Sequence, residues 1–420
     1  DMGQNQALYE AVKAVADAEP NLELSQKHAL ARSLLSFRLS GVALPEDKKQ
    51  RYREISQQLS SLSSKFSDNI LDATNAWFKQ VSDLALLKGI PESGLDMAQQ
   101  AAQQRHLDGW VFTLDFPSYY SVVAYADNRE LRAELYRAYT TRASDLGTNS
   151  AWDNTQTMRD ILRLRQEEAE LLGFANYAEV SLAMKMADTT QEVVDFLEDL
   201  AKRCKPFAEL EFAELKVFAQ EQLGINDVQA WDVTYISEKM KEARFDFTDE
   251  DLKPYFPVNK AIQGLFGLVE RLYSVRIQQS TAVDVWHPDV TFYQVYELDG
   301  SLRAEFYLDL YARQHKRGGA WMSDYCGRFK RKDGVQIPVA FMTCNGTPPV
   351  GDKPALFTHD EVVTLFHEFG HGLHHMLTKV DYPDIAGING VEWDAVELPS
   401  QFMENWCWEP EVLNMISGHW

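Results

Sequence analysis

The first two thirds of the chain carry apolar residues at the spacing of amphipathic helices. Within residues 45–78 the apolar side chains recur every three or four positions and form one stripe: Tyr52, Ile55, Leu59, Leu62, Phe66 and Ile70. Pro45, followed by Glu46 and Asp47, is typical of a helix start. Similar patterns cover 117–146, 154–186, 190–223 and 256–275. We therefore predict helices up to about residue 275, with these stripes as packing faces.

Extended segments are predicted at two places. Residues 109–116 read as a lone extended segment closed by Pro117. After about residue 275, segments 283–296 and 302–310 alternate aromatic or β-branched residues with polar ones, and the pair Asp299-Gly300 supplies a hairpin turn between them. A further extended run covers 339–344. The pattern thus predicts a mainly α protein with a small β-sheet.

Composition narrows the classes of partner. The chain has 420 residues, 45% of them hydrophobic, and a net charge of −22. Such an acidic protein repels phosphate backbones and anionic lipid, so neither nucleic acid nor a membrane surface is an expected partner. No apolar run reaches the length of a membrane span. The four cysteines lie far apart without a C-x-x-C pair, which favours a reducing compartment, and we expect a cytoplasmic protein.

The clearest cluster of potential metal-ligating and catalytic residues is the motif H-E-x-x-H, formed by His367, Glu368 and His371. On an α-helix, residues four positions apart lie on one face, so the two imidazoles can bind one Zn²⁺. Glu368 is then placed to take a proton from a water molecule at the metal. The alternative is a buried helix whose histidines bond to backbone or carboxylates, but this explains neither the glutamate nor the spacing.

The motif requires a helix, and its beginning is well marked. Thr358 and Glu361 form a T-x-x-E capping box, and Phe357 and Val362 occupy the hydrophobic-staple positions. Within this helix Gly370 and Gly372 each cost about 1 kcal/mol relative to Ala. Such glycines are tolerated where another backbone or a substrate approaches closely.

A catalytic zinc usually has three protein ligands, and spacing alone leaves the third ligand open. The downstream candidates are Asp381, Asp384, Glu392, Asp394, Glu397 and Glu404. Asp394 and Glu397 form a D-x-x-E start signal for a second helix, which favours Glu397 over Glu404 without excluding it. Residues 387–390 are expected to form a flexible loop that borders a substrate. His374 and His375 are expected to be core or supporting residues.

Two long runs carry a family resemblance. Residues 357–374 (FTHDEVVTLFHEFGHGLH) and 396–406 (VELPSQFMENW) resemble the thimet oligopeptidase and neurolysin family of zinc metallopeptidases. The likeness extends to 114–119 (LDFPSY), 285–290 (VWHPDV) and 306–313 (FYLDLYAR), and so covers nearly the whole chain.

The resemblance implies a ligand set and a fold. It makes His367, His371 and Glu397 the metal ligands of one Zn²⁺ per chain, with Glu368 as the catalytic general base. The implied fold is mainly α: a zincin-like, two-lobed peptidase with a small β-sheet near the zinc site and a deep channel that admits short unfolded peptides. It also implies that segment 339–344 pairs with the substrate backbone.

The domain prediction divides the chain in two. Residues 1–130 would form an N-terminal helical region, and 131–420 a metallopeptidase catalytic region. This second region would contain a β-rich part at about 276–345 and the zinc helices at 358–408.

The predicted activity is hydrolysis of internal peptide bonds in short oligopeptides by a monomeric zinc endopeptidase. Two alternatives remain open: a dipeptidyl carboxypeptidase of the same family, or a helical peptide-binding protein with an inactive zinc motif. Members of the family have further segments at both ends, including a tyrosine and a histidine that resemble oxyanion stabilisers. We therefore expect a chain truncated at both ends that is weakly active or inactive by itself.

Overall fold

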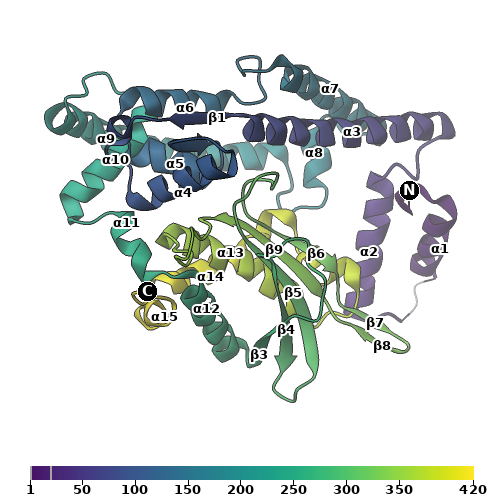
Figure 1. Cartoon of the computed structure of the whole chain (residues 1–420). Coiled ribbons are helices and arrows are strands. Elements are labelled where there is room, and N and C mark those ends of the chain that lie inside the picture. The colour runs from purple at the N-terminus through teal and green to yellow at the C-terminus, as the bar shows by residue number, and fades with distance from the viewer. Residues whose placement is uncertain (1, 19–20) are drawn as a thin grey trace.

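The computed structural model describes residues 2–18 and 21–420. It consists of a helical lobe and a mixed lobe, joined on one side by the helices that lead from one lobe to the other (Figure 1). The helical lobe contains two short antiparallel strands, β1 (Phe78–Val81) and β2 (Trp110–Thr113). Its helices are α1 (Gln6–Asp17), α2 (Leu24–Leu39), α3 (Glu46–Ala76), α4 (Glu92–Gln104), α5 (Phe116–Tyr125), α6 (Arg129–Thr141), α7 (Thr155–Leu172), α8 (Tyr177–Leu182), α9 (Thr190–Leu223), α10 (Ala230–Phe245) and α11 (Asp249–Leu252).

The mixed lobe contains a five-stranded sheet and four helices. The strand order is β3-β4-β5-β9-β6, with β5 and β9 parallel and the other neighbouring pairs antiparallel. The bounds are β3 (Val275–Ser280), β4 (Thr291–Glu297), β5 (Leu302–Tyr311), β6 (Trp321–Cys326) and β9 (Val339–Gly346), with a small hairpin of β7 (Phe329–Arg331) and β8 (Gly334–Gln336). The helices are α12 (Val258–Tyr273), α13 (His359–Met376), α14 (Leu398–Asn405) and α15 (Pro410–Ile416).

Apolar packing joins α12 and α13 to the sheet. Phe266 of α12, Phe306 of β5 and Phe369 of α13 contact one another at ring centroid distances of 5.4–6.0 Å. The buried cluster around them extends from Phe256 to Ile416, and a separate cluster fills the helical lobe between Val81 and Leu135. Because the aromatic contacts fix α13 on the sheet, they also fix the face on which its histidines lie. The predicted division at residue 130 remains a prediction.

The mainly α fold class is confirmed, with differences in detail. The predicted helix 117–146 is two helices, because Asn128 caps α6 through a bond from the Leu131 backbone N–H. The segment after Gly109 is not alone, since β2 pairs with β1, which the helical stripe of 45–78 had concealed. The predicted hairpin forms with Gly300 at φ 86°, but the first strand begins only at Thr291. Strands β3 and β6 to β8 were not predicted.

The expected pairing of segment 339–344 with a substrate backbone is wrong. Strand β9 lies between β5 and β6, so both of its edges are already occupied by main-chain hydrogen bonds. Among the described strands of this sheet, β6 is the edge on that side. Any extended peptide that joins the sheet next to the histidine helix must therefore pair with β6.

No helix among those described has both the length and the apolar content needed to cross a bilayer.

A buried ionic cluster holds the β5–β6 connection against the sheet. Asp309 of β5 is 3% exposed, and its carboxylate accepts hydrogen bonds from Arg313, at 2.6 and 2.8 Å, and from the Lys316 ammonium at 2.8 Å. Lys316 also donates to the backbone carbonyls of Tyr311 and Cys344. Burial works against ionisation of Asp309, but the cationic donors outweigh it and lower the pKa of its carboxyl group to about 2.

We predict that Asp309→Asn destabilises the chain by about 3–5 kcal/mol at pH 7, because it leaves the buried Lys316 ammonium without its counter-charge. The depressed pKa means that Asp309 contributes fully above pH ~4 and loses this contribution as the pH falls towards ~2. Urea unfolding of both chains at pH 7 measures the difference. Asp333→Asn, a change in the exposed β7–β8 turn, is the control. Equal unfolding midpoints for Asp309→Asn and the wild type would contradict the prediction.

Candidate metal centre

The helix that carries the histidines begins as predicted. Thr358 caps α13 by accepting a bond from the Glu361 N–H, and the Glu361 carboxylate accepts one from the Thr358 N–H at 2.8 Å. Phe357 and Val362, the staple pair, are both buried. Glu361 also accepts bonds from the backbone N–H and the hydroxyl of Thr347, at 2.7 and 2.8 Å. The first turn of α13 is therefore attached to the end of β9 as well as capped.

A close approach of two helices brings the carboxylate to the histidines. A Cβ atom on Gly370 would lie 2.5 Å from the Pro399 carbonyl oxygen and 2.6 Å from the Ser400 Cα. Only glycine leaves room for α14 to approach α13 at this point. Glu397 is the residue immediately before α14, so this contact sets its position relative to the imidazoles. The second glycine, Gly372, makes room for the Met342 sulfur of β9.

Three donor atoms converge where the helices meet. The Nε2 atoms of His367 and His371 each lie 3.1 Å from Oε2 of Glu397. All three lie within 4.8 Å of one another. Burial opposes the ionised form of Glu397, but a 2.7 Å bond from the Ser400 hydroxyl and the two imidazoles outweigh it and lower its pKa. The structure thus selects Glu397 from the six candidate carboxylates as the one beside both histidines.

Glu404, the second candidate, lies on the opposite side of the same imidazole. Its Oε1 is 2.5 Å from Nδ1 of His367, whereas Glu397 faces Nε2. A carboxylate at the distal ring nitrogen fixes both the orientation of the ring and the proton on Nδ1, which leaves Nε2 as an electron-pair donor. Glu404 therefore supports His367 and does not join the three convergent atoms.

Glu368 is buried beside this group, at 6% exposure. Burial raises the pKa of its carboxyl group to about 7, the negative charge of Glu397 adds to the rise, and His367 opposes it. The backbone N–H of Met322 in β6 faces this carboxylate and slightly lowers its pKa. Oε2 of Glu368 has no hydrogen-bond partner among the described residues. The glutamate is thus placed between the histidine pair and the edge strand, with one oxygen free to take a proton.

Three expectations about the surroundings need correction or refinement. Asp394 does not begin the second helix; its carboxylate accepts bonds from the Met186 and Ala187 N–H groups, at 3.0 Å each. Segment Gly387–Gly390 is a 3₁₀ turn rather than a flexible loop. It packs closely on α13, because a Cβ on Gly387 would lie 2.7 Å from the His375 Cα. His375 is fully buried and bonds the Cys326 carbonyl of β6 at 3.0 Å.

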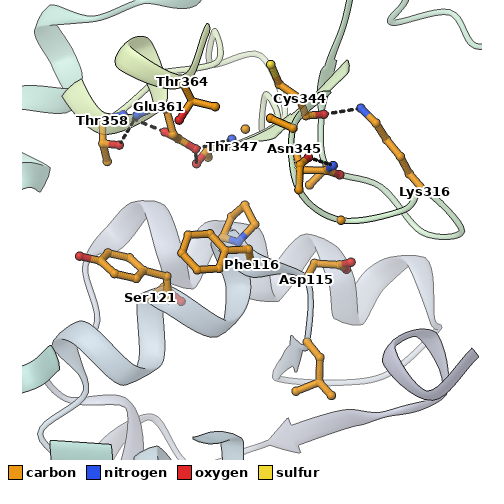
Figure 2. Close-up of a pocket in the computed structure, with 18 of the residues that line it drawn as sticks. Asp115, Phe116, Ser121, Lys316, Cys344, Asn345, Thr347, Thr358, Glu361 and Thr364 are labelled. Atoms are coloured by element: carbon orange, nitrogen blue, oxygen red, sulfur yellow. Dashed lines mark hydrogen bonds between the residues drawn. The ribbon is translucent and has the colours of Figure 1, made fainter. Parts of the chain in front are cut away.

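A cavity of about 720 Å³ lies between the lobes and is lined by the first turns of α13, but by none of the three donor residues. One wall comes from α13 and the end of β9, including Thr347, Glu361 and Thr364, and the opposite wall from the helical lobe, including Phe116 and Ser121 (Figure 2). The cavity reaches α13 at Thr364, three residues before His367. Sequence reasoning did not find it, because its walls come from several segments that lie far apart in the sequence, such as 115–121 and 344–347.

A helix with two imidazoles and an adjacent glutamate, crossed by a second helix that brings a carboxylate, is the arrangement of the HExxH metallopeptidases. Within that class, the profile of peptidase family M3 matches residues 122–420, and the chain belongs to this family.

Comparison with curated proteins also identifies peptidases as relatives of the chain. Oligopeptidase A of Escherichia coli and that of Salmonella typhimurium are each 54% identical to the chain over 423 positions, covering 100% of the chain and 62% of the relative. Dipeptidyl carboxypeptidase of E. coli is 30% identical, covering 100% of the chain and 61% of the relative. The chain thus spans less than two thirds of the length of these relatives. The predicted resemblance to the thimet oligopeptidase family is confirmed, and within this family the chain is similar to oligopeptidase A.

A solved structure titled PZ peptidase A with inhibitor 2 shares the fold. Its TM-score is 0.57 at 14% identity, and the match covers 99% of this chain and 57% of that one.

We predict that Gly370→Ala destabilises the chain by about 1–3 kcal/mol, although alanine is the better helix former by about 1 kcal/mol. The added methyl group would overlap the α14 backbone, which has no flexible end to move aside. Thermal unfolding measures the change. Gly327→Ala is the control, since its Cβ would meet Pro383 at an ordinary 3.6 Å. A Gly370→Ala chain as stable as the wild type would show that α14 does not depend on this contact.

Proposed function

We propose that this chain carries the metal centre of a zinc-dependent endopeptidase that hydrolyses internal bonds of short, unfolded oligopeptides. The carrying observation is the convergence of two imidazole nitrogens and one carboxylate oxygen beside a buried glutamate. Ligands of a tetrahedral zinc with bonds of about 2.1 Å lie roughly 3.4 Å apart. The two nitrogen–oxygen distances of 3.1 Å are close to this value, and the N₂O donor set is one that zinc prefers.

In this proposal His367, His371 and Glu397 hold one Zn²⁺ per chain. When bound, the ion polarises the scissile carbonyl and makes water a better nucleophile near neutral pH. Glu368 accepts the proton of the attacking water on its unpartnered oxygen and passes it to the nitrogen of the leaving amine. Glu404 holds the His367 ring in place through Nδ1.

Strand β6 is the proposed docking edge for the peptide. It is the free edge of the sheet beside Glu368, and the backbone N–H of Met322 in this strand faces the Glu368 carboxylate. A peptide that pairs with β6 would be held mainly by main-chain hydrogen bonds, which suits broad sequence tolerance. The same pairing would favour an unfolded substrate, because most strands of a folded protein are already paired within its own sheets.

The same proposal extends to the cellular location of the protein and to the turnover of this chain by itself. A cytoplasmic location is supported by four cysteines without disulfide partners and by the bacterial oligopeptidases A among the relatives. We also infer weak or absent turnover by the 420-residue chain alone, because it covers only 62% of the length of those relatives. Turnover equal to that of a full-length relative would contradict this second point.

Two substitutions should separate metal binding from proton transfer. Glu397→Ala should lower zinc affinity by more than about 100-fold, beyond the effect usual for an outer-sphere partner. Glu368→Gln should retain one zinc per chain and lower whatever turnover the wild type shows by roughly 10²–10⁴-fold. Zinc titration with a chromophoric chelator gives affinity and stoichiometry without relying on activity. A Glu397→Ala chain with unchanged zinc affinity would remove Glu397 from the ligand set.

An endopeptidase is distinguished from the dipeptidyl carboxypeptidase alternative by its products. We expect a peptide amidated at its carboxyl end to be cleaved at an internal bond, because the proposed docking edge binds main chain rather than a terminus. Mass spectrometry of the products identifies the bond. Release of carboxy-terminal dipeptides, only from peptides with a free carboxylate, would favour the exopeptidase. Zinc-dependent peptide binding without any cleavage, measured on a full-length gene product, would favour the inactive binding protein.

A further inference from the structure

Acidic side chains gather on one part of the wall of the interlobe cavity. Asp249 and Glu250 of α11 line it from the helical side, and Asp360 of α13 lines it from the mixed lobe. Glu238 of α10 lies behind them and accepts a bond from the Tyr120 hydroxyl at 3.4 Å. The pKa of Tyr120 is raised by burial first and then by Glu238, Asp249 and Asp360, so these carboxylates surround one phenol.

Lysines neutralise only part of this charge. Lys241 pairs with Asp249, and Lys253 pairs with Glu250. Asp360 is exposed, and none of the described residues forms an ion pair with its carboxylate. Lys241 also lies 4.0 Å from Glu238, so the two lysines are outnumbered by the four carboxylates and leave an excess of negative charge at this end of the cavity, which suits a cation.

A second observation concerns a hydroxyl without a hydrogen-bond partner at the acidic end of the cavity. Tyr125 lines the cavity and is 7% exposed, and its hydroxyl has no hydrogen-bond partner among the described residues. A buried hydroxyl without a partner is unfavourable, because it has lost its hydrogen bonds to water without replacing them. The pKa of Tyr125 is raised by burial and by Glu238, Tyr120, Glu250 and Asp249, which places its hydroxyl within the same acidic group. A ligand with several N–H donors could satisfy both the hydroxyl and the carboxylates.

The aromatic wall beside these groups suits an organic cation with an apolar stem. Phe116 is 56% exposed and stacks on Tyr120, with ring centroids 5.6 Å apart, and both residues line the cavity. Tyr125 meets Tyr120 edge to face at 6.2 Å. Aromatic faces attract ammonium and guanidinium groups, and the methylene stems of lysine and arginine pack well against rings.

We propose that this acidic end of the cavity, formed by Asp249, Glu250 and Asp360 around Tyr120 and Tyr125, binds the side-chain cation of a lysine or arginine in the bound peptide. The proposal rests on the proposed function and deepens it, because it names a preferred substrate class. Since the cavity reaches α13 three residues before His367, the cation would lie a few residues away from the scissile bond.

Binding to a non-cleaving, zinc-loaded Glu368→Gln chain tests this inference. The probes are fluorescent eight-residue peptides, acetylated and amidated, in which one lysine is moved along an alanine-rich sequence and compared with methionine at the same position. We expect lysine to bind about tenfold more tightly than methionine at one or two positions. Asp360→Asn should reduce that ratio to below about threefold, whereas Asp352→Asn, an exposed acid outside the cavity wall, should leave it unchanged.

Tyr125→Phe provides an independent readout. Removing a hydroxyl that lacks a partner should leave the free chain as stable as before or more stable, while weakening the lysine-containing peptide at the preferred position. A clear loss of stability in the free chain would show that the hydroxyl has a structural partner, and would overturn its part in the site.

The remaining outcomes separate this inference from the proposed function. Peptides that bind with no preference for lysine over methionine at any position overturn the inference and leave the peptidase proposal intact. Failure of every peptide to bind overturns both. If only a peptide with a free amino terminus gains affinity, and loses it in Asp360→Asn, the cation is the terminal ammonium and the assignment to a side chain is wrong.

Discussion

The contact between α13 and α14 at Gly370 is the constraint on which the rest of the centre depends. A helix can place two imidazoles on one face by its own periodicity, but it cannot bring a carboxylate to them. That carboxylate comes from Glu397, and it arrives only because the α14 backbone passes where a side chain on residue 370 would stand. The aromatic packing of Phe266, Phe306 and Phe369 behind α13 holds the other side of the helix in place. The donor group is therefore a product of tertiary packing.

Neighbouring residues also help to hold the residues of the centre in their orientations. Three polar groups near the centre have a neighbour that helps to orient them: Ser400 of α14 bonds Glu397, Glu404 of α14 bonds His367, and Met322 of β6 lies beside Glu368. These contacts join α13, α14 and the edge strand β6. Such outer contacts restrict ring rotation and carboxylate orientation before any ligand arrives. The cavity beside them is built differently, because its two walls belong to different lobes.

Local signals explain which parts could be predicted from sequence. The beginning of α13 is encoded by Thr358 and Glu361 alone, so the capping box was predicted and is present. Glu397 stayed one candidate among six on residue patterns, because its position depends on a long-range approach, and the family resemblance was needed to choose it. Strand β6 was missed because its sequence, WMSDYC, shows no clean alternation on a partly exposed edge. The break before α6 depends on one cap, Asn128, inside a continuous apolar stripe.

Glu361 serves the helix and the sheet at once, since it accepts bonds from Thr358 in the helix cap and from Thr347 at the end of β9. Thr347 and Glu361 both line the cavity, whereas the imidazoles follow two turns later on the same helix. A molecule in the cavity that pulled Thr347 away would loosen the turn that anchors the histidines. By reciprocity of binding free energies, occupation of the histidine site would then disfavour that molecule by the same factor. Under that condition, Glu361 would be the residue through which the two sites are coupled.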